Sequence, residues 1–210
     1  MKKLATISTV VVMCAAAFVM STANAGTITI NGFQGETRIG LNAGVIGVTV
    51  AGITGVTDGS FGTFCIEIQE HINIGSTYNA QTNTKAIKGG EAVSDPLDPK
   101  TAWLFNQYST GAIVLGSNAD RADFQLAIWK LEDEFTGVLT AQAQTYYDLA
   151  AASTWTDIGL IRVLNLGTAA DNFQYQDLLV TANENVPEPA TIAMLSMGFF
   201  ALIKRKFRKK

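Results

Sequence analysis

Residues 120–135 read DRADFQLAIWKLEDEF and contain the clearest helix pattern in the chain. Apolar residues recur there at i, i+3, i+4, i+7 and i+11, a spacing that places them on one helical face: Phe124, Ala127, Ile128, Leu131 and Phe135. Asn118 or Asp120 is expected to cap the start of the helix. The pattern therefore predicts an amphipathic helix in the middle of the chain.

On either side of this helix, the sequence predicts shorter helices and a set of strands. Helices are expected at 101–108 and 141–152, strands at 27–30, 37–41, 45–50, 62–74, 158–166 and 173–181, and a long surface loop at 81–100. The order is strands, then helices, then strands, without regular alternation. It predicts an α+β fold with a mainly antiparallel sheet or sandwich and a small helical insertion.

The expected strand 62–74 has a definite alternation. Successive side chains of a strand point to opposite faces, so two sets of residues are expected on the two faces: Phe64, Ile66, Ile68 and Glu70 on one, and Cys65, Glu67, Gln69 and His71 on the other. His71 would lie roughly 20 Å from Cys65 at about 3.3 Å per residue. That separation excludes a Cys-His catalytic dyad within the strand, and we interpret His71 as an ordinary surface histidine.

The N-terminus has the pattern of an export signal. Lys2 and Lys3 precede an apolar run over residues 4–20, which contains Cys14. Residues 23–25 read Ala-Asn-Ala and fit a small-x-small cleavage site. We therefore predict a signal peptide over 1–25, cleaved between Ala25 and Gly26.

The C-terminus has three parts in order. Pro187, Glu188 and Pro189 are followed by an apolar segment at 190–203 and a basic tail at 204–210. As a transmembrane helix the apolar segment would span roughly 21 Å, short of the roughly 30 Å hydrocarbon core, and the basic tail would stop translocation. It would hold an exported chain in the inner membrane only weakly, as suits a signal that is later removed.

These C-terminal residues resemble the PEP-CTERM sorting signal of Gram-negative bacteria. The resemblance implies an exosortase as partner, transient anchoring in the inner membrane, and then secretion, cell-surface exposure or retention in a biofilm matrix. The expected organisation is a signal peptide (1–25), an exported domain (26–181), a linker (182–186) and a sorting signal (187–210).

Charge and cysteine content limit what the exported part can do. Residues 26–186 contain seven Lys and Arg against 17 Asp and Glu, a net charge of about −10, which argues against a nucleic-acid partner. Cys65 is the one cysteine that remains after the signal peptide is removed, so no intramolecular disulfide can form. An odd cysteine in an exported protein is buried, paired between chains or chemically used.

Two motifs resemble the thioester domain of bacterial surface adhesins. One is Phe64-Cys65-Ile66, and the other is FQLAIW at 124–129. The resemblance implies an internal thioester between Cys65 and Gln125, sheltered by Phe64, Ala127, Ile128 and Trp129. It also implies an adhesin that couples covalently to surface amines. Trp129 follows Gln125 by four residues and would lie on the same side of the helix, over the bond.

A noncovalent role remains the alternative. In it, Cys65 and Gln125 merely pack, and the domain is a structural or polysaccharide-binding module of the extracellular matrix. Neither case predicts an enzyme with turnover, a cofactor or a metal site. Asp95 and Asp98, or the acidic run 132–134, lack the spacing of a calcium loop.

Overall fold

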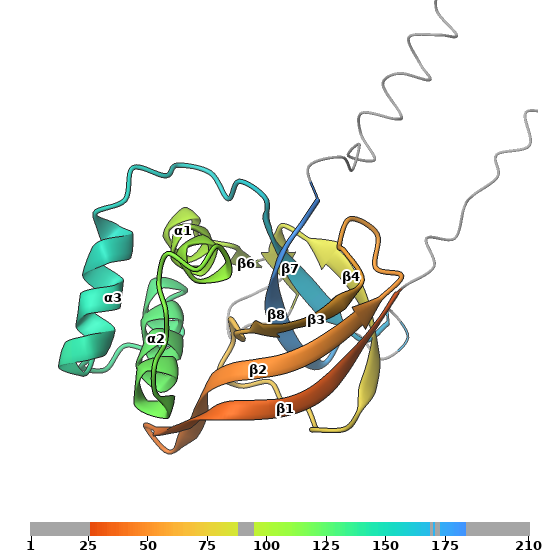
Figure 1. Cartoon of the computed structure of the whole chain (residues 1–210), viewed down its shortest axis with the longest axis horizontal. Helices are drawn as coiled ribbons and strands as arrows, with labels where there is room; N and C mark the ends of the chain where they lie inside the picture. Colours follow the sequence, from red (N-terminus) through yellow and green to blue (C-terminus); the bar gives the residue numbers. More distant parts are fainter. Residues whose placement is uncertain (1–25, 88–94, 169, 171–172, 184–210) are drawn as a thin grey trace, which may run out of the picture.

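The computed structural model describes residues 26–87, 95–168, 170 and 173–183 (Figure 1). The expected signal peptide and the sorting signal at 187–210 lie outside the described residues. In the described part, no helix combines the length and apolar character needed to cross a membrane.

Six strands form one antiparallel sheet in the order β3-β2-β1-β4-β7-β8. They are β1 (Gly26–Arg38), β2 (Leu41–Ala51), β3 (Gly59–Thr63), β4 (Thr77–Asn83), β7 (Ile161–Leu166) and β8 (Tyr175–Thr181). A small second sheet pairs β5 (Lys85–Ala86) with β6 (Asp95–Pro96). The helices α1 (Pro99–Ser109), α2 (Asn118–Leu131) and α3 (Ala141–Ala151) come between β6 and β7. This confirms the α+β class with its helical insertion.

The sheet curls until its two edges meet just after β3. Cys65 forms an isolated antiparallel bridge with Leu178 of β8. The amide of Leu179 donates to the carbonyl of Phe64 at 3.0 Å, and the amide of Ile66 donates to the carbonyl of Asp177 at 3.2 Å. The segment 64–66 therefore seals the edge of β8, and Cys65 lies on this seam.

The three helices lie together on one side of the curled sheet, as Figure 1 shows. Helix α2 packs between β1 and β2 on one side and α1 and α3 on the other. Its residues 122–129 are all buried, as expected for a helix that is covered all round. The predicted helix is confirmed, and its packing against the sheet and the flanking helices also buries residues outside the face that its five apolar residues share.

The expected strand 62–74 was wrong. Strand β3 ends at Thr63, and the chain then runs irregularly to β4. Residues 63–67 are buried without alternation, because the segment lies on the seam, with the sheet on one side and α2 on the other. Residues 81–83 were expected to lie in a surface loop but belong to strand β4. Strand β4 pairs with β1 and β7, and these pairings hold it in the sheet although its own sequence pattern is weak.

The N-cap of α2 is Ser117, and neither predicted residue holds that position. Its hydroxyl accepts from the amide of Asp120 at 3.0 Å, and Asp120 accepts from the amide of Ser117 at 3.0 Å. This capping box satisfies backbone donors at both residues. Asp120 therefore contributes to the cap from the third position of the helix. Phe135 lies beyond the end of the helix at Leu131.

Candidate functional site: a clasped cysteine and glutamine

The structure brings Cys65 and Gln125 into direct contact across 60 residues of sequence. The amide of Cys65 donates to Gln125 Oε1 at 3.2 Å, and Gln125 Nε2 donates to the carbonyl of Cys65 at 2.7 Å. The thiol sulfur lies 3.4 Å from Oε1. Both hydrogen-bonding groups of the Gln125 carboxamide are therefore held by the backbone of Cys65.

The fold produces this contact from two directions. Cys65 is fixed by its bridge to Leu178 at the seam of the sheet. Gln125 lies in the second turn of α2, which the cap at Ser117 and the packing on β1 and β2 hold in place. The carbonyl carbon Cδ of Gln125 is bonded to Oε1 at about 1.23 Å, so it lies at most about 4.6 Å from the sulfur.

Burial controls the ionisation of the thiol. Cys65 is 3% exposed and Gln125 is fully buried. Burial raises the pKa of the Cys65 thiol to about 12, and the indole N–H of Trp129 offsets part of this rise. That N–H is buried and has no hydrogen-bond partner among the described residues, so we regard its effect on the sulfur as that of a nearby dipole. The thiol is neutral at rest.

A pocket of about 320 Å³ lies next to the pair. Cys65 and Trp129 form part of its wall, together with Ile68, His71 and Gln176. Other parts of the wall come from the β1–β2 hairpin, including Phe33 and Leu41. Cys65 therefore forms part of the wall of a pocket that could hold a small molecule or a side chain.

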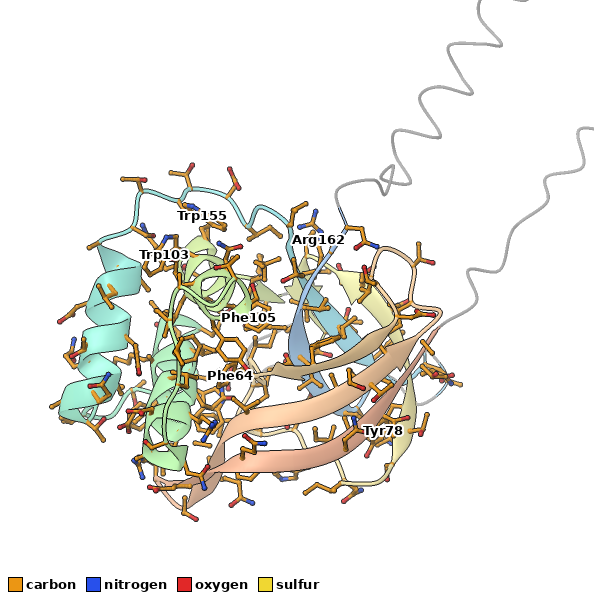
Figure 2. All side chains as sticks on the ribbon, in the orientation of Figure 1. Phe64, Tyr78, Trp103, Phe105, Trp155 and Arg162 are labelled. Carbon is orange, nitrogen blue, oxygen red and sulfur yellow. The ribbon has the colours of Figure 1, made fainter. Side chains whose placement is uncertain are left out.

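The four residues expected to shelter the bond occupy two different places. Trp129 is 1% exposed and belongs to the same apolar cluster as Cys65. Phe64, Ala127 and Ile128 are fully buried in the neighbouring cluster. The Phe64 ring packs there against Phe124 at a centroid distance of 4.8 Å, and Figure 2 shows it between the sheet and the helices. These three residues pack in that neighbouring cluster, whereas Trp129 shares the cluster of Cys65 and lines the adjacent pocket.

His71 lies closer to Cys65 than an extended strand would allow. Since residues 64–76 are not a strand, the separation of roughly 20 Å assumed for it does not apply. Exposed His71 and buried Cys65 line the same pocket, although no hydrogen bond joins them. Extended-strand geometry therefore does not separate Cys65 from His71 in this fold.

The acidic residues considered earlier as metal ligands have structural roles. Asp98 caps α1 by accepting from the amide of Lys100 at 2.6 Å. Glu132 is buried and accepts from the amide of Asp98 at 3.2 Å. A different set was missed, because its members come from distant parts of the sequence: Glu67, Glu70 and Asp177.

Comparisons with known proteins give few matches. No curated protein sequence matches the chain. Among solved structures, the N-terminal thioester domain of a surface protein from Clostridium perfringens is 14% identical, with a TM-score of 0.45, and covers 73% of this chain and 97% of its own. The N-terminal thioester domain of the fibronectin-binding protein SfbI from Streptococcus pyogenes is 11% identical, with a TM-score of 0.42, covering 80% and 97%.

The sorting signal is matched directly. Residues 185–209 match the model of the PEP-CTERM protein-sorting motif, and this segment includes Pro187, Glu188 and Pro189. Such a motif implies export, an exosortase as partner and membrane-associated sorting in a Gram-negative bacterium. The chain therefore carries a PEP-CTERM sorting motif behind a domain whose buried Cys65 and Gln125 are in contact.

Proposed function

We propose that the domain is a single-use covalent adhesin, exposed on the cell surface or in the extracellular matrix. Its Cys65 and Gln125 side chains would form an internal thioester that couples to an amine on the target. The observation that carries the proposal is the clasp of the Gln125 carboxamide by the backbone of Cys65, with the sulfur 3.4 Å from the amide oxygen. A packing role alone does not require a thiol next to a carboxamide carbon.

Formation of the bond would follow from these contacts. The Cys65 sulfur attacks Cδ of Gln125, and the negative charge that develops on Oε1 is stabilised by the amide of Cys65. The C–N bond then breaks, and the thiol proton leaves with the amide nitrogen as ammonia. One C–S bond replaces one C–N bond, and no oxidant or metal is consumed.

Coupling would use the adjacent pocket. An amine that enters it attacks the same carbon, an amide to Gln125 forms, and Cys65 regains its proton as a free thiol. His71 lines the pocket and is suited to accept the proton of the incoming amine. Until then the buried position of the pair protects the thioester from water. Because the product is stable, the domain acts once and does not turn over.

The first test is the intact mass of the purified protein, before and after treatment with methylamine. We expect the measured mass to be lower by one ammonia than the mass calculated for the chain between its actual termini. After treatment, we expect the mass to increase by one methylamine. Cys65→Ala should abolish both changes. An unmodified mass with a titratable Cys65 would contradict the proposal and leave the noncovalent structural or polysaccharide-binding role.

The buried thiol also predicts how bond formation depends on pH. Because burial raises the pKa of Cys65 to about 12, the thiolate fraction rises about tenfold per pH unit between pH 6 and 9. The thioester is first opened with ammonia, and the protein is then transferred to ammonia-free buffer. The rate at which the thioester re-forms, followed by mass as loss of one ammonia, should rise about tenfold per pH unit. A rate that stays level across this range would show that a neighbouring base removes the proton, and His71→Ala would then identify it.

A further inference from the structure

Three carboxylates meet beside the seam, and one of them, Glu70, lines the same pocket as Cys65. One oxygen each of Glu67, Glu70 and Asp177 lies within 4.8 Å of the others. Glu67 and Glu70 belong to the irregular segment after Cys65, whereas Asp177 belongs to β8. The closure of the sheet therefore assembles three acidic groups from positions more than 100 residues apart.

Three oxygens of Glu67 and Asp177 lack a hydrogen-bond donor in the described part of the chain, whereas Asp177 Oδ2 accepts from the amide of Ile87 and from Asn165 Nδ2. Glu67 is 1% exposed, and neither of its carboxylate oxygens has a hydrogen-bond partner. Asp177 is fully buried, and its Oδ1 has none. Neither residue forms an ion pair among the described residues. Buried carboxylates in such a state are costly unless a positive charge balances them.

A fourth oxygen belongs to a neutral side chain. Asn165 of β7 is fully buried, and its Nδ2 donates to Asp177 Oδ2 at 2.7 Å and to the carbonyl of Lys85 at 3.1 Å. Its amide oxygen Oδ1 has no hydrogen-bond partner in the described residues. A buried amide acceptor without a donor, on a side chain bonded to Asp177, is a second sign, besides the acidic residues, that this part of the core lacks a positive partner.

We propose that Glu67, Glu70 and Asp177 bind a calcium ion. Two oxygens that both lie about 2.4 Å from one ion are at most about 4.8 Å apart, so the separations in the cluster suit a shared Ca²⁺ with bonds of roughly 2.3–2.6 Å. The ligand atoms are all oxygens, which excludes a typical zinc site. The enclosed position also disfavours Mg²⁺, which keeps several of its waters.

The site would control the segment that carries the cysteine. Glu67 lies two residues after Cys65, and Asp177 accepts the amide of Ile66 through its backbone carbonyl. A bound cation would link this segment to β8 through the side chains of Glu67 and Asp177. The calcium site is independent of the thioester, because none of its ligand atoms takes part in the clasp.

The test is thermal unfolding of the purified protein, first stripped with EGTA and then titrated with CaCl₂ or MgCl₂. We expect the midpoint to rise by roughly 5–10 °C when Ca²⁺ exceeds its dissociation constant a hundredfold, and to respond less to Mg²⁺. Equilibrium dialysis should show one bound Ca²⁺ per chain. Cys65→Ala should retain this response, which separates the site from the proposed thioester.

Glu67→Gln should abolish calcium binding, with Glu70→Gln as a second variant if the first does not fold. The matched control is Glu132→Gln, which removes another buried carboxylate outside the cluster and should bind Ca²⁺ normally. Failure of the wild-type protein to bind Ca²⁺ would overturn the proposal. So would equal binding by Glu67→Gln. In either case a proton shared between Glu67 and Glu70 would explain the buried charges.

Discussion

Gln125→Glu is expected to reduce methylamine incorporation to background and to destabilise the domain. A carboxylate at this position does not acylate a thiol, so no thioester would form. It would also replace the Nε2 donor with an oxygen facing the carbonyl of Cys65, which now accepts from Nε2 at 2.7 Å. An unpaired charge at a fully buried position should cost about 3–5 kcal/mol. Urea denaturation and intact mass would measure the two effects.

The matched control is Gln107→Glu on α1, where the same exchange occurs at a partly exposed residue. It should leave methylamine incorporation unchanged and alter the free energy of unfolding by less than about 0.5 kcal/mol. Methylamine incorporation by Gln125→Glu at the wild-type level would show that another residue supplies the acyl group. An unchanged free energy of unfolding would show that the clasp does not form in solution.

Trp129→Ala is expected to shorten the life of the thioester and to weaken the fold. The indole fills space beside Cys65 and forms part of the pocket wall. Removing a fully buried aromatic side chain costs about 3–5 kcal/mol, and the larger pocket would admit water to the bond. The loss of the thioester at neutral pH, followed by mass as gain of one water, should be faster than in the wild-type protein.

Trp155→Ala separates these two consequences. Trp155 is partly exposed, follows α3 and packs against the apolar cluster that does not contain Cys65, and it does not line the pocket. Figure 2 labels it on the segment after α3. Its loss should lower stability with little change in the hydrolysis rate of the thioester. Equal hydrolysis rates in Trp129→Ala and the wild-type protein would mean that Trp129 only packs. Equal acceleration by both variants would indicate that general loosening admits water.

The local patterns of the sequence predicted the elements better than their surroundings. All three helices were placed to within a few residues, because periodicity and capping act within a few turns. The pattern of one helix does not show how many neighbours cover it, so the sequence did not reveal that α2 is buried on more than one face. The predicted strand 62–74 was wrong for a related reason. Its apolar and polar residues alternate in the sequence, but the chain leaves β3 at Thr63 to pair with β8, and residues 63–67 are all buried.

By itself, the sequence determined the sorting motif, the strand-helix-strand order and the chemistry available at Cys65 and Gln125, and it predicts the N-terminal export signal. These depend on residues that are adjacent along the chain, or on the identity of single side chains. Only the tertiary structure decided that the Cys65 backbone holds the carboxamide and that His71 lines the same pocket. It also gathered Glu67 and Asp177 from either edge of the sheet. The physical reason is that closing the sheet creates contacts between distant segments, and local patterns do not encode their distances.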